Sequence, residues 1–209
     1  MTGHKIDEIL KSVYDSDNSV DIREHLATLK AYASECDKVT ELGVRWVVST
    51  WAFMAAKPKN LNSFDLDHFS NYGVSADTLY EAAKDSGVEF VFHQENVLTT
   101  NNLKDTDLLF IDTLHSYKQL KMELHLHASK ARKYIIFHDV VSFGESDEAE
   151  VPYSDDWPED LKKYYATLKD NTGINLAIAE FLTAHPEWRI ANMYTNNNGL
   201  LVIRRDSNA

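Results

Sequence analysis

The sequence has almost none of the features that mark secreted or membrane proteins. Its 209 residues include a single cysteine, Cys36, so no internal disulfide can form. No stretch approaches the roughly 18 uninterrupted apolar residues of a membrane helix. The first ten residues also lack the basic start and the apolar run of a secretory signal. The sequence therefore predicts a cytoplasmic protein that does not insert into a membrane.

Positive charge is also scarce, with 21 lysines and arginines against 33 aspartates and glutamates and a formal net charge of −12. Proteins that hold nucleic acid neutralise its phosphates with a basic surface, and no basic stripe offsets the acidic balance here. We expect no nucleic-acid partner and favour a small molecule as the ligand. Apolar residues make up 44% of the chain, which is enough for one sizeable core, so we expect one domain over residues 1–209. The oligomeric state stays open, a homo-oligomer included.

The order of the predicted elements is that of an α/β protein. Helical spacing of apolar residues makes residues 1–37 a helical N-terminal extension of two helices, the second of them capped by Asp21. Short apolar strands then alternate with helices. The predicted strands are 38–42, 61–66, 88–92, 107–112 and 134–139, and the predicted helices between them are 46–56, 76–86 and 116–131. Parallel strands need such crossover helices, so the sequence predicts a parallel sheet with helices on both faces.

The last part of the chain departs from this alternation. A predicted helix over 174–185 is followed by two strands, 188–194 and 200–204, that flank Asn196-Asn197-Asn198-Gly199, a strong hairpin signal. The predicted fold is therefore a Rossmann-like open sheet, mostly parallel, with a C-terminal antiparallel hairpin. Residues 142–160 are acidic and irregular, and they form either a lid or an insertion.

Polar residues end five consecutive predicted strands. A single one is more often a cap of a strand or helix. Their recurrence favours a binding site, because ligands of open parallel sheets bind outside the carboxyl ends of the strands. The polar strand ends are Glu41, Gly43, Asp65, Glu95, Asn96, Asp112, His115, His138 and Asp139.

The turn after the first strand carries a family motif. Residues 41–50 read ELGVRWVVST and resemble the first motif of class I S-adenosylmethionine-dependent methyltransferases. The nearest resemblance is to small-molecule O-methyltransferases, whose turn reads acid-x-Gly-x-x-x-Gly-x-Ser. It covers nearly the whole chain, and it implies S-adenosylmethionine as the cofactor. Val47 departs from the pattern, since it stands where the family has its second glycine. The sequence does not decide whether this valine abolishes cofactor binding.

The resemblance also implies which residues contact the cofactor. Gly43 would let the backbone approach its methionine part, Ser49 would bind its carboxylate, and Asp65 would accept hydrogen bonds from the ribose. Asp65 follows Gly43 by 22 residues, as an acid closing the next strand should. Asn96, or else its neighbour Glu95, would contact the adenine. The full set of expected cofactor residues is Glu41, Gly43, Ser49, Asp65, Asn96 and Asp112.

A metal site is implied by the resemblance to metal-dependent O-methyltransferases of the catechol and macrolide-sugar types. Asp112, His138 and Asp139 stand where that family holds a divalent cation. Acids at the ends of adjacent strands can share one ion, which relieves their repulsion. Imidazole suits manganese, iron or zinc better than magnesium, so the identity of the metal is open. Alternatively, His138 points back into the sheet and bonds a backbone carbonyl.

His115 is the expected general base, because it lies three residues after Asp112 where this family carries its proton acceptor. It could instead cap the following helix or be a further metal ligand. The predicted function is methyl transfer from S-adenosylmethionine to a hydroxyl of a small polar molecule, with metal assistance. Two alternatives remain: a metal-dependent enzyme of another reaction on the same scaffold, and a binding protein with a degenerate cofactor turn. The sequence does not name the methyl acceptor.

Overall fold

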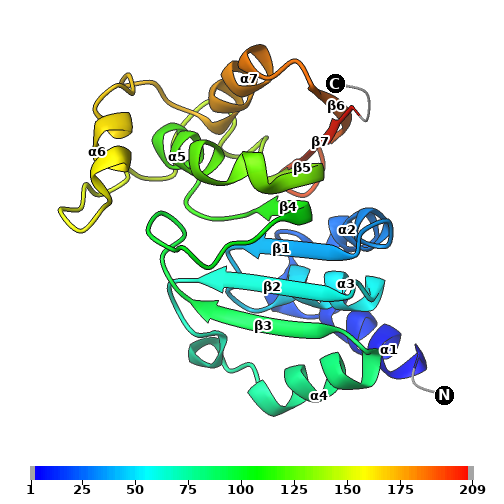
Figure 1. The fold of residues 1–209 in the computed structure, drawn as a ribbon. Helices are drawn as coiled ribbons and strands as arrows, with labels where there is room; N and C mark the ends of the chain where they lie inside the picture. The colour runs from blue at the N-terminus through cyan, green and yellow to red at the C-terminus, as the bar shows by residue number, and fades with distance from the viewer. Residues whose placement is uncertain (1–2, 207–209) are drawn as a thin grey trace.

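The predicted alternation of strands and helices is present in the computed structural model, which describes residues 3–206 (Figure 1). The strands are β1 (Lys38–Leu42), β2 (Asn60–Asp65), β3 (Glu89–Gln94), β4 (Thr106–Ile111), β5 (Ala131–His138), β6 (Trp188–Tyr194) and β7 (Leu200–Arg205). The α-helices are α1 (Gly3–Tyr14), α2 (Leu26–Ala33), α3 (Val48–Ala56), α4 (Ala76–Ser86), α5 (Tyr117–His127), α6 (Glu159–Tyr165) and α7 (Ile174–Ala184). Within the described range, no helix has both the length and the apolarity needed to cross a membrane.

The seven strands form one sheet in the order β3-β2-β1-β4-β5-β7-β6. The first five are parallel, and β7 lies antiparallel between β5 and β6. This arrangement confirms the predicted fold class. Chain order reverses between β1 and β4, so the carboxyl edge of these two strands is where a ligand site is expected.

The central strands are buried on both faces, which is why they read as continuous apolar runs. Side chains of β4 alternate between the two faces: Phe110 packs in a core with Phe53 of α3, and Leu109 packs in a second core with Phe137 and Ile178. Helices α1 and α2 both pack on α3 on the first side, and α5 packs on α7 on the second. The sheet therefore has its helices on both faces, as predicted.

Some predicted boundaries were wrong. Asp21 does not cap α2, because a 3-10 turn, η2 (Arg23–His25), intervenes and His25 takes the N-cap position without a side-chain hydrogen bond. Strand β5 begins at Ala131, three residues before the predicted start, since Ala131 still pairs with Thr106 of β4. The short helix α6 was not predicted.

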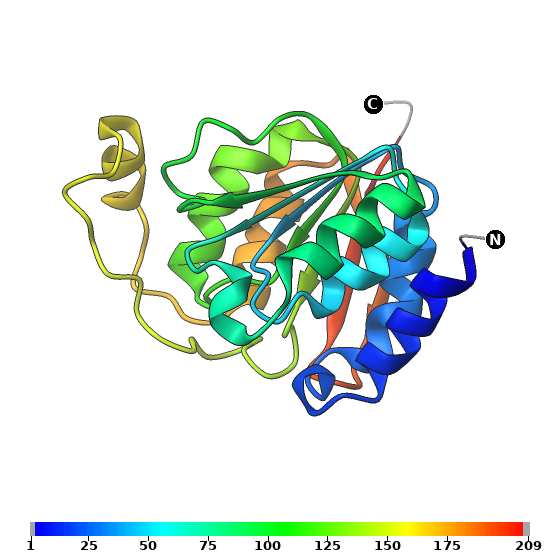
Figure 2. The same ribbon diagram turned by 90° about the horizontal axis from the view of Figure 1, so that it is seen from below.

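The irregular segment 142–160 divides into two parts. Its end leads into α6, which stands at one end of the molecule away from the sheet (Figure 2). Its beginning runs back over the carboxyl edge, where Phe143 and Gly144 accept backbone hydrogen bonds from Ile174 and Asn175 at the start of α7. Only this first part lies near the strand ends.

Candidate functional site

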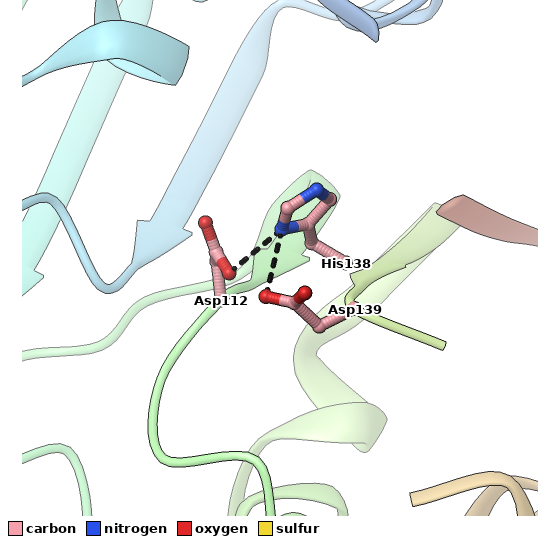
Figure 3. A group of neighbouring side chains, drawn as sticks. All are labelled: Asp112, His138 and Asp139. Carbon is pink, nitrogen blue, oxygen red and sulfur yellow. Dashed lines mark hydrogen bonds and ion pairs between the residues drawn. The ribbon is translucent and has the colours of Figure 1, made fainter. Parts of the chain in front are cut away.

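Three of the predicted site residues meet at the carboxyl edge of the sheet (Figure 3). Asp112 follows β4, His138 ends β5 and Asp139 follows it, and the pairing of the two strands places them side by side. His138 Nδ1 lies 3.2 Å from Asp112 Oδ1 and 3.1 Å from Asp139 Oδ2. One ligand atom from each residue lies within 4.8 Å of the others. This Asp112–His138–Asp139 group is referred to below as the acid–histidine cluster.

His115 joins the same cluster. Its Nε2 lies 3.2 Å from Asp112 Oδ1 and 3.1 Å from Asp139 Oδ2, the same two oxygens that His138 contacts. Its ring stacks on Phe143, with 5.1 Å between the ring centroids. The N-cap of α5 is Ser116, whose hydroxyl accepts a hydrogen bond from the Gln119 amide. The alternative that His115 caps this helix was therefore wrong.

The two histidines and the acids strongly perturb one another. Burial alone would lower the pKa of both imidazoles, but the hydrogen bonds and charges of Asp112 and Asp139 outweigh it. They raise the pKa of His115 to about 9 and that of His138 to about 10. Burial would likewise raise the pKa of Asp112, yet the charge of His138 and the hydrogen bond from His115 keep it well below its usual value. The two carboxylates thus favour the protonated form of both imidazoles.

The donor set of the cluster fits a divalent cation. His138 Nε2 lies 3.3 Å from the carbonyl oxygen of Asn197, so an Nε2–H donating to that carbonyl would leave the Nδ1 lone pair facing both carboxylates. Two carboxylate oxygens and one imidazole nitrogen are ligands that manganese, iron and zinc accept in proteins. The contact with a backbone carbonyl, foreseen as an alternative to metal binding, involves the other nitrogen and so is compatible with it.

The turn after β1 packs directly on this cluster. Gly43 has φ +86°, and a Cβ there would lie 1.9 Å from the carbonyl oxygen of Asp112. The Asp112 amide in turn donates to the Leu42 carbonyl across 2.8 Å. Only glycine fits this close approach of two backbones.

Asp65 is bound to the same turn. Its Oδ2 accepts hydrogen bonds from the amides of Val44 (2.7 Å) and Arg45 (3.0 Å), and its Oδ1 accepts one from Asp67 (2.9 Å). The Gly43 turn and the end of β2 are therefore joined by hydrogen bonds. The ribose contact of Asp65 stays a prediction.

Glu41 and Ser49 meet inside the protein. Both are buried, and the Ser49 hydroxyl donates to Glu41 Oε1 across 2.5 Å. Thr50 and Ser63 donate to Glu41 Oε2. Burial outweighs these hydrogen bonds and raises the pKa of Glu41 to about 7. The hydrogen bond between Ser49 and Glu41 ties the start of α3 to the end of β1 inside the protein. The Ser49 hydroxyl therefore donates to Glu41 and does not face solvent.

Val47 adopts a left-handed backbone conformation, which favours glycine. Its φ is +57°, a left-handed value that is rare for a β-branched residue. Its side chain is 1% exposed and packs in the core on the α1–α4 side. The valine therefore combines a left-handed backbone with a side chain that is buried away from solvent.

Asn96 lies apart from the cluster, at the end of β3. The order of the sheet places β2 and β1 between β3 and β4. Asn96 Oδ1 accepts a hydrogen bond from the Leu98 amide, which closes a local turn. Its neighbour Glu95 accepts hydrogen bonds from Thr100 and Asn102. Neither residue contacts the cluster, and the predicted adenine contact stays a prediction.

An open groove of about 420 Å³ was missed by sequence reasoning. One wall comes from the N-terminal extension, one from the turn after β1 and one from the hairpin tip. Its lining residues are Asp17, Asn18, Val20, Asp21, Arg45, Trp46, Asn197 and Asn198. The hairpin tip is tied to the first wall, since Asn197 Nδ2 donates to the Val20 carbonyl (2.6 Å) and Asn198 Nδ2 to the Asp21 carbonyl (3.2 Å). The three asparagines had indicated only a turn.

Asp21 connects the groove with the cluster electrostatically. Burial, followed by the charge of Asp112, raises the pKa of Asp21. On the other side, the Asn197 carbonyl contacts His138 from the hairpin tip. The groove and the acid–histidine cluster are therefore neighbours.

The start of the 142–160 segment contributes two further acids. Glu148 Oε2 lies 3.0 Å from His115 Nδ1, and the Glu148 amide donates to the His115 carbonyl. Asp147 Oδ1 accepts hydrogen bonds from the amides of Tyr117 (2.8 Å) and Gly173 (2.7 Å), at the starts of α5 and α7. These bonds fasten the segment beside His115. The acidity of the segment was visible in the sequence, but its contacts were not.

Comparisons with known proteins bear on the fold. No protein-family model matches the sequence, and a search of curated proteins finds no match. Among solved structures, the O-methyltransferase of Bacillus cereus in complex with S-adenosylhomocysteine is similar, with a TM-score of 0.55 and 13% identity over 98% of this chain and 90% of that one. The O-methyltransferase TomG of Streptomyces achromogenes, in complex with S-adenosylmethionine, has a TM-score of 0.58 and 13% identity over 95% and 89%.

A third similar structure is the S-adenosylhomocysteine-bound methyltransferase of Podospora anserina, with a TM-score of 0.54 and 14% identity over 99% of this chain and 88% of that one. Identities this low establish a shared fold and leave the activity to the site. The resemblance inferred from the sequence is thus confirmed at the level of architecture. The chain has the fold of the S-adenosylmethionine-dependent O-methyltransferases.

Proposed function

We propose that the protein transfers the methyl group of S-adenosylmethionine to a hydroxyl of a small polar molecule, with the help of a divalent cation. One observation carries this proposal: Asp112, His115, His138 and Asp139 converge beside the Gly43 turn, at the edge where chain order reverses. The fold supports it, because the similar structures include O-methyltransferases bound to S-adenosylhomocysteine or S-adenosylmethionine.

The cofactor is proposed to lie over the ends of β1 and β2. The Gly43 backbone would approach its methionine part, Asp65 would accept from the ribose hydroxyls, and Asn96 would contact the adenine. Asp112, which packs on Gly43, would border the same space. Glu41 and Ser49 would contribute through the turn that their hydrogen bond supports.

Asp112, His138 and Asp139 are proposed to hold the cation. A divalent cation there would orient the acceptor and lower the pKa of its hydroxyl. His115 would take the proton of the acceptor hydroxyl. Its Nε2 lies against the two carboxylates that would hold the cation, while its Nδ1 contacts Glu148. A cation bound to these carboxylates would weaken their stabilisation of the protonated His115 and so would lower its pKa toward the range that suits a general base.

Binding of S-adenosylhomocysteine tests the cofactor half of this proposal. Asp65→Ala should weaken binding by about 1.5–3 kcal/mol, because it removes charge-assisted hydrogen bonds. Asp65→Asn is the matched variant, since its amide oxygen can still accept from the Val44 and Arg45 amides and so separates support of the turn from ligand contact. Titration calorimetry provides the affinities. Equal affinities of wild type and Asp65→Ala would contradict the ribose assignment.

Metal binding should strengthen with rising pH. Protons on His138 and His115 neutralise the carboxylates and block Nδ1 of His138, and both pKa values are raised, to about 10 and about 9. The affinity for Mn²⁺ is therefore expected to rise between pH 6 and pH 9, by up to about tenfold per pH unit for each proton displaced. Calorimetry in buffers of different ionisation enthalpy would measure the proton release.

A variant of one proposed ligand and a control variant outside the cluster test the metal site. Asp112→Ala should cut the affinity for Mn²⁺, whereas Asp105→Ala should not, because Asp105 pairs with Arg132 where β4 and β5 begin, at the opposite end of these strands from the cluster. An affinity that stays constant with pH would argue against the cluster as the metal site. A protein that binds Mn²⁺ but fails to bind S-adenosylhomocysteine would be a metal-dependent enzyme of another reaction. A protein that binds neither would be a non-catalytic binding protein.

A further inference from the structure

The groove has an uneven charge distribution. Among the described residues that line it, Arg45 alone is basic, while Asp17 and Asp21 are acidic. The Arg45 side chain is 60% exposed, and its guanidinium lies over the Trp46 ring at 4.6 Å from the centroid. Its Nη1 is 3.7 Å from Asp21 Oδ2. A cation and an anion thus face each other across the groove at a distance that makes only a weak exposed ion pair.

The residue expected to bind the cofactor carboxylate is turned elsewhere. Ser49 is 4% exposed, and its hydroxyl donates to the buried Glu41. Redirecting that hydroxyl would remove one of the hydrogen bonds that satisfy Glu41 in the protein interior, which is unfavourable for a buried polar group. A carboxylate at the turn after β1 therefore needs another donor.

The backbone holds Arg45 where such a donor is needed. Arg45 has φ +48°, a left-handed value that is unfavourable for residues with a Cβ, and its amide is bound by Asp65. Unfavourable conformations persist where the surroundings fix them and are concentrated at binding sites. This conformation places the side chain in the groove, two residues after Gly43.

We propose that Arg45 and Asp21 bind the amino-acid end of the cofactor, with Arg45 on its carboxylate and Asp21 on its ammonium group. This inference rests on the proposed function. A planar guanidinium offers two parallel N–H donors to a carboxylate, and an aspartate opposite it complements the positive group of the same zwitterion. The 3.7 Å pair in the free protein would be exchanged for two stronger contacts with the ligand.

The test compares two ligands by calorimetry: S-adenosylhomocysteine and its decarboxylated analogue, which keeps the amino group and lacks only the carboxylate. Arg45→Ala should weaken S-adenosylhomocysteine binding about 10- to 100-fold and leave binding of the analogue unchanged. The affinity of Arg45→Lys for S-adenosylhomocysteine should lie between those of the wild type and Arg45→Ala, because an ammonium group keeps the charge but lacks the two parallel donors. Asp21→Asn should weaken both ligands, since both carry the amino group.

Arg132→Ala is the matched control, because Arg132 has a similarly exposed side chain (58%) and is likewise paired with an aspartate. Its partner Asp105 lies where β4 and β5 begin, at the opposite end of the strands from the groove. Arg132→Ala should change neither affinity. The inference would be overturned if Arg45→Ala lost the same affinity for both ligands, or lost affinity for neither. It would also be overturned if Ser49→Ala, and not Arg45→Ala, lost affinity for S-adenosylhomocysteine while keeping affinity for the analogue. If the wild type bound neither ligand, the proposed function itself would be wrong, and this outcome differs from all of those above.

Discussion

Gly43→Ala is expected to lower the free energy of unfolding by about 2–5 kcal/mol, from overpacking together with left-handed strain. The added Cβ would lie 1.9 Å from the carbonyl oxygen of Asp112. Neither backbone can move away without loosening the hydrogen bond from the Asp112 amide to Leu42, which joins the ends of β1 and β4. The displacement would also misplace Asp112, so affinity for a divalent cation should fall with stability. Denaturant unfolding and Mn²⁺ titration measure the two effects.

Gly73→Ala separates the clash from the backbone strain. Gly73 has φ +78°, close to that of Gly43, but a Cβ there meets nothing within 4 Å. This variant should lose only about 1 kcal/mol, the cost of a left-handed alanine. If Gly43→Ala proved no less stable than Gly73→Ala, the close packing of the turn on Asp112 would be refuted.

His115→Ala is expected to lower turnover about 10²- to 10⁴-fold, the usual contribution of a general base. The measurement is transfer of a labelled methyl group to any hydroxylated acceptor that the wild type methylates. Affinities for S-adenosylhomocysteine and Mn²⁺ should be retained, because the proposed ligands Asp112, His138 and Asp139 remain. His125→Ala is the control, since the His125 ring stacks on Tyr164 at 3.9 Å and lies outside the cluster.

The same variant distinguishes the remaining alternative for His115. If His115 is a further metal ligand, His115→Ala should lose affinity for Mn²⁺. The contacts of His115 Nε2 with both acids are the observation that favours this alternative. Turnover at the wild-type rate from pH 6 to pH 9 would show that His115 is not the base. The proton would then have to leave through water or another residue.

The acid–histidine cluster could be predicted because strand ends are local in sequence. Asp112 and His138 each close a continuous apolar run, and runs of that kind become adjacent parallel strands whose ends coincide. The terminal hairpin was equally readable, since its asparagine–glycine turn is a local signal. Sequence reasoning thus brought His115, His138 and the two acids to one edge before any contact was known.

Partners that come from distant segments were not predictable in this way. Glu41 and Ser49 were expected to face the cofactor, but both are buried, and Glu41 also accepts a hydrogen bond from Ser63, 22 residues away on β2. Glu148 belongs to a segment without periodicity, so nothing in the sequence indicated its contact with His115. The same holds for Asp21, which was expected to cap a helix and instead lines the groove.

The sequence by itself determined the order of strands and helices and the polar residues at the strand ends, because apolar periodicity and turn chemistry act over a few residues. Only the tertiary structure decided which hydroxyls and carboxylates are used up inside the protein and which face the groove. That choice depends on burial and on hydrogen bonds between residues far apart in the chain, such as the Asn198 amide on the Asp21 carbonyl. Val47 shows the same division: the sequence shows only that it departs from the glycine motif, whereas the structure shows its side chain packed in the core and its backbone at φ +57°, in the left-handed region that favours glycine.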